Sequence, residues 1–388
     1  MISKIQGVLS LWAHQIAGIV FSFLPVRKGL VVLSNYNGRG VGDCVAPIIY
    51  ELLKRNVAVE IVLLVNNLAT PTPAGVRKIK RGWINEKIVL ARAQIRISNT
   101  KGSFDFVRKR GSYYIQLWHG DLPFKFIEAE CEDRLSNYYT TLSKKDSQKT
   151  DFVVSGSSLF SKIARESFWY PSSCRILEYG NPRKDRFFSI VSKEVLAFKQ
   201  CYFGSEKIHI ALIAPTFRLN IPNEAIQFDV KRFHAELEHK FGGKWIVVVR
   251  LHPNIAHRED LFNFGGPIVN GTLIDDGQML ALASDLLVTD YSSIVEDFLL
   301  QKKPVFLYVK DLKDYIEYER KLRDLYFRLP FPRCLTSDEL IKAVESFDCT
   351  KYAQKLDIFL SQDYRIFDDG HASERVVDLI ENLLEDNG

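Results

Sequence analysis

The segment from Asp285 to Leu300 constrains the fold of this chain more than any other. Seven residues, Asp290 to Glu296, separate an apolar run that ends at Thr289 from a second apolar segment. This pattern predicts a strand that stops at a turn of small hydroxyl residues and passes directly into a helix. Strands that alternate with helices form α/β proteins built around a parallel sheet.

The start of this predicted helix offers donors to an anion. Its first backbone N–H groups lack partners within the helix, and the helix dipole adds partial positive charge there. Ser292 and Ser293 supply two more donors, which makes the turn a candidate phosphate site. The alternative is that one of these serines only caps the helix.

Three further apolar runs end on a histidine or an arginine. They are residues 113–118, 210–217 and 245–249, which precede His119, Arg218, and Arg250 with His252. Ligands of open α/β sheets bind outside the carboxyl ends of the strands. We therefore expect these side chains and the serine turn to line one shared cleft.

The length of 388 residues suits two doubly wound domains rather than one core. We expect an amphipathic membrane-associating segment, two Rossmann-like domains and a set of final helices, at residues 1–28, 29–200, 201–349 and 350–388. Strands of the first domain are predicted near residues 29–34, 59–65, 88–90, 95–98, 113–118, 152–155 and 175–178. Strands of the second domain are predicted near residues 208–214, 244–250, 268–270, 286–289 and 304–307.

The charge is divided unevenly along the chain. The net charge is +5, but residues 1–200 carry +14 and residues 201–388 carry −9. A basic first half suits an anionic membrane surface or a phosphorylated acceptor. Its clusters at 77–81 and 108–110 accompany no nucleic-acid-binding motif, so we expect no nucleic acid partner. The alternative for each cluster is a solvated surface.

The first residues suggest contact with a membrane. No charged side chain occurs from Ile5 to Val26, and apolar residues recur there at spacings of four and three, which predicts an amphipathic helix. A ridge of polar residues favours a helix that lies in the interface over one that spans the bilayer. Arg27 and Lys28 at its end favour a peripheral or monotopic protein on the cytoplasmic face of the cell membrane. A spanning anchor and a helix packed on its own domain stay open.

Several cofactor classes lack their sequence signals. The glycines at 38, 40 and 42 are not spaced as in dinucleotide-binding loops, and the next strand ends at Asn66 instead of an acidic residue. The six cysteines are scattered without a C-x-x-C pair, which indicates reduced thiols and no zinc site. No metal ligand is assigned, and a divalent cation such as Mg²⁺ stays open.

Six strings occur in one order from about residue 30 to residue 382. They are QLWHGDLPFKF, YGNPRKDRF, APTFR, RLHPN, LLVTDYSSIVEDFLLQKKPVFLYVKDLKDY and DDGHASERVVDLI. Together they resemble the CDP-glycerol glycerophosphotransferase family of teichoic acid synthesis. The resemblance implies a GT-B fold, in which two doubly wound α/β domains face a central cleft. It also implies transfer of a polyol phosphate from CDP-glycerol, or another CDP-polyol, to a hydroxyl of a lipid-linked saccharide or a growing wall or capsule polymer, with release of CMP.

The first domain is expected to hold the acceptor. His119 matches the family string W-H-G and is expected to act as the base, because a histidine accepts a proton near neutral pH. Gly120, Asp121 and Lys125 follow it and are expected to bind the acceptor. Asp121 replaces the threonine usual in the family, which leaves the acceptor and the polyol open.

The second domain is expected to hold the CDP donor. His252 is predicted to contact its diphosphate, as a hydrogen-bond donor or as the acid for the departing CMP. Arg218 and Arg250 are predicted to bind phosphate oxygens, and the alternative is an ion pair with Asp290 or Glu296. The other predicted donor-binding residues are Asp290, Ser292, Ser293 and Glu296.

Two other functions remain for such a chain. One is a GT-B glycosyltransferase that uses a UDP- or GDP-sugar. The other is a membrane-bound binding module that has lost catalysis, although the presence of both His119 and His252 argues against it.

Overall fold

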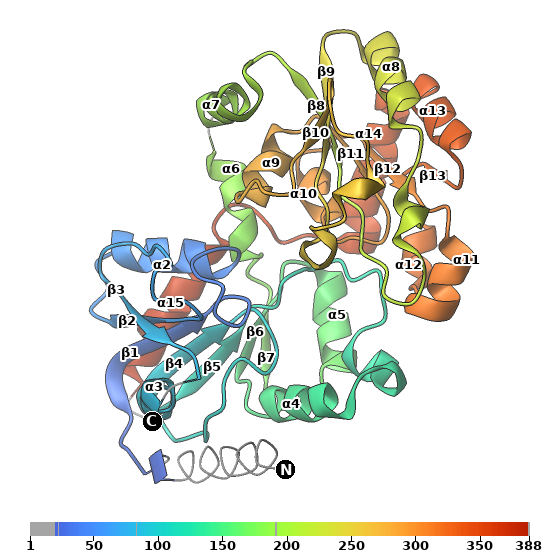
Figure 1. Ribbon diagram of the computed structural model, residues 1–388. Coiled ribbons are helices and arrows are strands. Elements are labelled where there is room, and N and C mark those ends of the chain that lie inside the picture. The colour runs from blue at the N-terminus through green and yellow to red at the C-terminus, as the bar shows by residue number, and fades with distance from the viewer. Residues whose placement is uncertain (1–19, 22, 83, 191, 387–388) are drawn as a thin grey trace, which may run out of the picture. The chain divides into compact units, whose positions relative to one another are not determined.

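The computed structural model describes residues 20–21, 23–82, 84–190 and 192–386, and these form two compact units (Figure 1). Unit 1 combines the described residues up to Asp121 with Ile127–Phe188 and the residues from Ile366 onward. Unit 2 consists of Leu122–Phe126 and Ser189–Arg365. Of the amphipathic segment predicted at 1–28, residues 1–19 and 22 lie outside the described part. Within that part, no helix combines the length and apolar character needed to cross a bilayer.

Unit 1 is built on a seven-stranded parallel sheet in the order β3-β2-β1-β4-β5-β6-β7. The strands are β1 (Arg27–Ser34), β2 (Glu60–Val65), β3 (Val76–Lys80), β4 (Ala93–Ser98), β5 (Tyr113–Gln116), β6 (Phe152–Val154) and β7 (Arg175–Leu177). The chain winds outward from β1 in one direction and from β4 in the other. The pair β1 and β4 is therefore the switch point at which doubly wound sheets bind their ligands.

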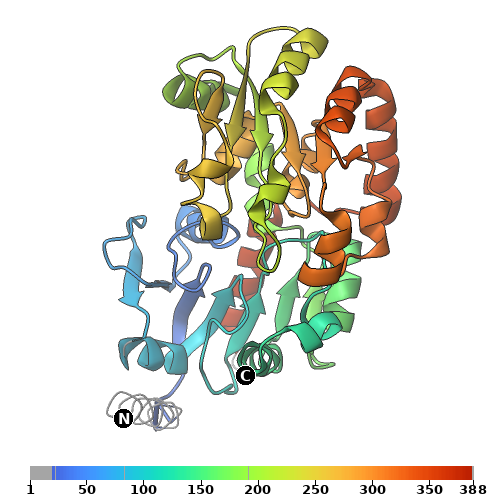
Figure 2. The ribbon, with the colours of Figure 1, turned by 45° about the vertical axis from the view of Figure 1, so that its right-hand side comes forward.

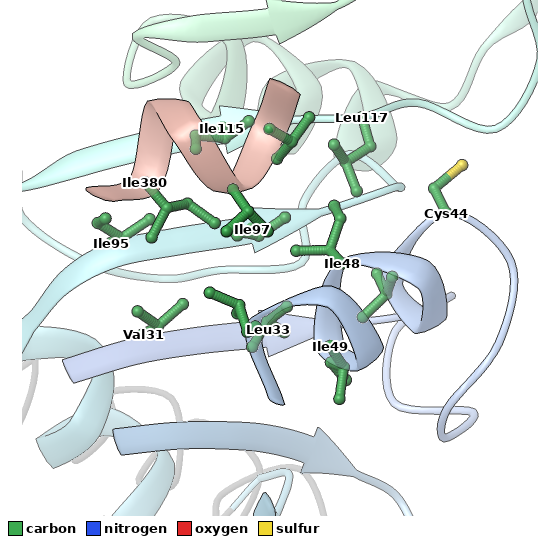
Figure 3. Close-up of a cluster of buried hydrophobic side chains, with 14 of the residues drawn as sticks. Val31, Leu33, Cys44, Ile48, Ile49, Ile95, Ile97, Ile115, Leu117 and Ile380 are labelled. Carbon is green, nitrogen blue, oxygen red and sulfur yellow. The ribbon is translucent and has the colours of Figure 1, made fainter. Parts of the chain in front are cut away.

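Helices cover both faces of this sheet. The helices of unit 1 are α2 (Val45–Lys54), α3 (Ile84–Arg92), α4 (Asn137–Ser147), α5 (Ser158–Ser167), α6 (Arg186–Ser189) and α15 (Ala372–Glu385). The last residue of α6 belongs to unit 2. Val31 and Leu33 of β1 face α2 and α15, where Ile380 packs over β4 (Figure 3). Leu30 and Val32 face the opposite side, in the cluster that includes α3. The unbroken apolar run of residues 30–33 in β1 is what a parallel sheet covered on both faces requires.

The strand predicted near residues 88–90 is wrong. These residues lie in α3, and Val89 and Leu90 join the core of the sheet. A run of three apolar residues fits a buried helix as well as a strand, so periodicity cannot distinguish the two. The strand present instead is β3, whose sequence Val-Arg-Lys-Ile-Lys lacks apolar alternation and predicts only a basic cluster.

Unit 2 repeats the same winding with six parallel strands in the order β10-β9-β8-β11-β12-β13. They are β8 (His209–Ile213), β9 (Trp245–Val249), β10 (Ile268–Asn270), β11 (Leu286–Thr289), β12 (Val305–Tyr308) and β13 (Arg333–Cys334). Its helices are α7 (Ser192–Phe203), α8 (Val230–Phe241), α9 (Gly277–Ala283), α10 (Val295–Leu300), α11 (Leu312–Asp314), α12 (Asp324–Phe327), α13 (Ser337–Glu345) and α14 (Cys349–Ile358). Helices α8 and α13 pack together on one side of the sheet, and α7, α9 and α10 lie on the other (Figures 1 and 2).

The observed division of the chain differs from the predicted one at three places. Helix α7 belongs to unit 2, so the change of unit comes after Phe188 and not at residue 200. Helix α14 also stays in unit 2, and the chain returns to unit 1 only at Ile366. The segment Leu122–Phe126, expected in the first domain, belongs to unit 2. Such assignments depend on contacts distant in sequence, which local patterns do not contain.

Candidate active site

Polar side chains gather at the carboxyl ends of neighbouring strands in unit 1. The strands β1, β4 and β5 end at Ser34, Ser98 and Gln116, and the loops that follow supply Asp43, Asn99 and His119. This is the switch-point edge of the sheet, as the sequence predicted for His119.

A hydrogen bond to the backbone fixes the tautomer of His119. Its Nδ1 lies 3.0 Å from the backbone oxygen of Asn99. Because a carbonyl oxygen only accepts, Nδ1 carries the proton and Nε2 is left as the acceptor. Burial lowers the pKa of His119, although the hydrogen bond to Asn99 partly opposes this. The ring centroid lies 4.1 Å from that of Trp118, whose φ of 53° is unusual for an aromatic residue.

Asp43 and Arg183 form an ion pair beside this histidine. Arg183 Nε lies 3.2 Å from Asp43 Oδ2, and Asp43 Oδ1 accepts hydrogen bonds from the backbone N–H of Cys44 at 2.8 Å and from Asn99 Nδ2 at 3.2 Å. Burial by itself raises the pKa of Asp43, but Arg183 and these hydrogen bonds lower it overall. Asn99 thus contacts both Asp43 and His119. Sequence reasoning missed Asp43 and Asn99, although both follow strands at the switch point.

Asp121 has a different role from the predicted acceptor contact. Its Oδ2 accepts from Lys184 Nζ at 2.9 Å and from Asn181 Nδ2 at 2.8 Å, and its Oδ1 accepts from the backbone N–H of Gly156 at 2.9 Å. Lys184 Nζ also lies 3.0 Å from Asp368 Oδ2, and the side chains of Asp121, Lys184 and Asp368 are about 1% exposed. Asp121 therefore fixes the loop that carries His119 and Gly120.

Gly156 and Asp368 show how tightly this network is packed. A Cβ atom on Gly156 would lie 2.4 Å from Asp121 Oδ2, so no larger residue fits there. Burial raises the pKa of Asp368 to about 6, because Lys184 opposes this only in part and Asp121 adds to it. Two carboxylates share one ammonium group, so Lys184 compensates the buried charge of Asp368 only in part.

In unit 2, Arg218 is an ion-pair residue and does not present a free guanidinium. Its Nη1 lies 2.9 Å from Asp290 Oδ2 and its Nε 2.6 Å from Asp311 Oδ2. All three side chains are buried, and the pKa of Arg218 is raised because the two carboxylates outweigh the effect of burial. The alternative that Arg218 pairs with Asp290 is therefore confirmed. Asp290 also accepts from the backbone N–H of Thr216 at 2.9 Å, which joins the ends of β8 and β11.

Neither serine of the turn is the helix cap that was the alternative to a phosphate site. Helix α10 has Ile294 at its N-cap position and begins at Val295. Ser292 Oγ accepts from the backbone N–H of Ile294 at 3.4 Å, and Ser293 is exposed. Both serines thus precede the cap position, at the carboxyl end of β11.

Glu296 is a buried tether instead of a donor contact. Its Oε1 accepts from the backbone N–H of Leu122 at 2.8 Å, and Tyr364 Oη donates to Oε2 at 3.3 Å. The following residues then pair with a second segment of unit 2, since the Phe126 N–H donates to the Lys321 oxygen at 3.0 Å. A carboxylate used in this way holds the segment Leu122–Phe126 on unit 2.

The hydrogen bond between Glu296 and Leu122 places Lys125 near residues that follow β8 and β11. Lys125 is half-buried near Asp290, Arg218 and Arg320, and burial lowers its pKa to about 8. Asp290 opposes the shift, whereas Arg320 and Arg218 add to it. A bound anion would favour the charged ammonium form of Lys125, because it offsets the cost of burial.

His252 has the opposite tautomer from His119. The backbone N–H of Asn254 donates to its Nδ1 at 3.2 Å, so the proton of the neutral ring lies on Nε2, which can donate. Nearby Arg250 donates to the backbone oxygens of Gly271 at 3.1 Å and Ile274 at 2.5 Å, and burial lowers its pKa. No hydrogen bond or ion pair joins Arg250 to Asp290 or Glu296 within the described residues.

The sequence does not decide whether the protein binds a metal ion. Across the described ranges, no three His, Cys, Asp or Glu side chains gather closely enough to form a metal site. The clustered cations and N–H donors described above are the groups in these residues that suit phosphate oxygens.

A family model described as CDP-glycerol:poly(glycerophosphate) glycerophosphotransferase matches residues 16–382. The teichoic acid poly(glycerol phosphate) polymerase of Bacillus subtilis is 25% identical over 98% of this chain and 52% of its own length, so this chain spans about half of that relative. The teichoic acid ribitol-phosphate primase of Bacillus spizizenii is 27% identical over 94% of both chains. The solved wall teichoic acid polymerase TagF has the same fold, with a TM-score of 0.83 and 22% identity over 99% of this chain and 98% of that chain.

The raised pKa of Asp368 predicts a pH-dependent stability. A group whose folded-state pKa lies above its ordinary value of 3.8 stabilises the fold most at low pH, and this contribution is lost as the pH rises through about 6. The stability of the wild type relative to Asp368→Asn should therefore fall by roughly 1–3 kcal/mol between about pH 4 and pH 7. Urea unfolding at several pH values measures this difference. Replacing the exposed Asp133 by Asn is the control, and an equal pH dependence for Asp368→Asn and Asp133→Asn would contradict the prediction.

Proposed function

Because this chain belongs to the CDP-glycerol:poly(glycerophosphate) glycerophosphotransferase family, we propose that it transfers glycerol phosphate, or a related polyol phosphate, from a CDP-activated donor to an acceptor hydroxyl. The observation that carries this proposal is the pair of histidines with opposite tautomers, each at the carboxyl end of a strand. One presents a bare nitrogen and the other an N–H group. Transfer of a phosphoryl group between oxygens needs one of each.

The proposed reaction is a displacement at the β-phosphorus of CDP-glycerol. The acceptor oxygen forms the new P–O bond while its proton passes to Nε2 of His119. The bond from the β-phosphorus to the bridging oxygen breaks, and CMP leaves with that oxygen. His252 Nε2–H donates a hydrogen bond to the developing negative charge, or transfers its proton to it.

The phosphates of the donor are assigned to groups of unit 2. We propose that Lys125, Ser292, Ser293 and Arg250 contact them, which moves Lys125 from the acceptor to the donor. Support for Lys125 comes from its lowered pKa beside Arg218 and Arg320, because a bound dianion stabilises the ammonium form. Arg218, Asp290 and Glu296 then position these groups through their buried ion pairs and hydrogen bonds.

The remaining assignments are part of the same proposal. We propose that the two doubly wound units follow the GT-B plan and that the protein works at the cytoplasmic face of the cell membrane as a peripheral protein. The acceptor is a lipid-linked saccharide or a growing wall or capsule polymer. Gly120, next to His119, is assigned to it. The polyol is glycerol in the name of one relative and ribitol in that of another, so both donors are relevant.

A panel of activated donors tests the reaction class. We expect CMP release from CDP-glycerol or CDP-ribitol with a lipid-linked saccharide acceptor, and no turnover of UDP-N-acetylglucosamine or GDP-mannose, because the proposed groups bind a polyol diphosphate. Nucleotide release is followed by chromatography. Turnover of a UDP- or GDP-sugar alone would make the protein a glycosyltransferase, and binding of a CDP-polyol with no turnover would favour a module without catalysis.

Separate histidine variants test the assigned roles. His119→Gln and His252→Gln should each lower kcat by about 10²–10⁴-fold, the usual contribution of a general acid or base. His239→Gln is the control, because His239 is exposed on α8. Since the pKa of His119 is lowered, the acid limb of kcat/KM in the wild type should lie below pH 6.5. Full activity in either active-site variant would disprove its role.

Lys125 should make donor binding sensitive to alkaline pH. With a pKa of about 8 in the free protein, the ammonium group is lost as the pH rises above that value. Lys125→Met should raise KM for the CDP donor by about 10–100-fold, the effect of losing a charged hydrogen bond. Lys125→Arg should keep its affinity at higher pH, because arginine stays protonated. The exposed Lys231→Met is the control, and identical pH profiles for Lys125→Arg and the wild type would contradict the assignment.

A further inference from the structure

The side chains of the basic cluster at residues 77–81 have different surroundings in the structure. Lys78 Nζ donates to the backbone oxygen of Leu68 at 2.7 Å, and Arg81 Nη1 donates to Ser34 Oγ at 3.1 Å. Arg77 and Ile79 instead line a cavity of about 290 Å³. The proposed transfer reaction uses none of these side chains.

Three arginines and an apolar surface form this cavity. Arg27, Arg77 and Arg92 line it together with Leu30, Ile79 and Val89. Arg27 is the first residue of β1, and Arg92 ends α3 directly before β4, so the cavity lies toward the amino ends of these strands. His119 follows the carboxyl end of β5. The two sites therefore occupy opposite edges of the same sheet.

The cavity keeps an excess of positive charge. Arg27 Nη1 lies 2.7 Å from Glu60 Oε2, and Arg77 Nη2 lies 2.7 Å from Glu60 Oε1. Arg92 pairs with no carboxylate of the described residues, and its Nε is buried without a hydrogen-bond partner there. Arg27 and Arg77 share the one carboxylate of Glu60, and Arg92 has none within the described part of the chain. The three guanidinium groups and one carboxylate leave two positive charges. A buried donor without a partner costs free energy that a bound anion recovers.

An exposed aromatic residue lies in the segment that precedes β1. Lys109 Nζ donates to the backbone oxygens of Leu24 at 2.5 Å and Ala91 at 2.6 Å, which holds the segment before β1 next to the end of α3. In that segment Phe23 is 83% exposed and Val20 is 56% exposed. Exposed apolar side chains next to a cationic pocket match the two layers of a lipid surface, its acyl region and its anionic headgroups.

We propose that this pocket binds the phosphate of an anionic phospholipid headgroup and that the edge around it is the membrane-facing surface of unit 1. A volume of about 290 Å³ lies at the lower end of ligand pockets, which suits a single headgroup better than a nucleotide. Arg92 supplies the guanidinium free to bind the phosphate, and Phe23 enters the apolar layer. This inference goes beyond the proposed reaction and does not depend on it.

Binding of the full chain to vesicles tests the pocket. Sedimentation with phosphatidylcholine vesicles is compared with and without phosphatidylglycerol. Arg92→Gln should lower the partition coefficient onto the anionic vesicles by about five-fold, the effect of one basic group at such a surface. Arg165→Gln removes the same charge from an exposed site on α5 of unit 1 and should have a smaller effect.

A second pair of variants tests the same pocket by gain of binding. Glu60→Gln removes the carboxylate shared by Arg27 and Arg77 and should strengthen binding to the anionic vesicles. Glu166→Gln, an exposed position on α5, is its matched control. Thermal unfolding of each variant shows whether the fold is intact. Sedimentation of each variant without vesicles measures aggregated protein, so this pair keeps the test valid if Arg92→Gln is unstable.

Several outcomes would overturn the proposal. Equal effects in both matched pairs, or equal binding to neutral and anionic vesicles, would show that the pocket does not recognise a headgroup. Thermal stabilisation by inorganic phosphate or glycerol phosphate that needs Arg92, without a vesicle effect, would assign the pocket to a free phosphate. CMP release measured in parallel keeps this test separate from the transfer reaction. Loss of vesicle binding with CMP release retained supports the headgroup site.

Discussion

The edge of the unit 1 sheet that carries His119 depends on one buried ammonium group, that of Lys184. Lys184 lies between Asp121 and Asp368, and through them it joins the loop after β5 to the segment before α15. Asp121 is two residues from His119, so this network sets the position of the candidate base. Removing one partner from a buried ion network leaves an uncompensated charge, which costs about 3–5 kcal/mol. The network thus couples folding of the C-terminal return to the geometry of the site.

Unit 2 also has a buried ion network at the ends of its strands, and its central cation is Arg218. Arg218 bridges Asp290 after β11 and Asp311 after β12, and Asp290 in turn binds the backbone of Thr216 after β8. Three strand ends are thereby held together beneath the serine turn. Glu296 binds the backbone N–H of Leu122 and thereby holds the segment that contains Lys125 at this edge. In both units, buried charges support an edge that carries less buried polar groups, His119 in unit 1 and His252 and Ser293 in unit 2.

Backbone contacts give the two histidines their separate roles. The oxygen of Asn99 can only accept, which leaves Nε2 of His119 without a proton, and the N–H of Asn254 can only donate, which leaves the proton of His252 on Nε2. The same residue type therefore serves as acceptor in one unit and as donor in the other. The arginine pocket lies toward the opposite edge of the first sheet, away from His119.

The sequence alone determined the α/β class, most strands and the place of His119 and His252 after strand ends, because apolar runs that end on polar residues are local patterns. It failed for residues 88–90, where a short apolar run fits a helix as well as a strand. It also assigned Asp121, Arg218 and Glu296 to ligands, whereas the fold gives them buried partners. Those partners, such as Asp368 for Lys184 and Leu122 for Glu296, lie far away in the chain. Only the tertiary structure decides them, since the partner of a charged group depends on which distant segments pack together and exclude water.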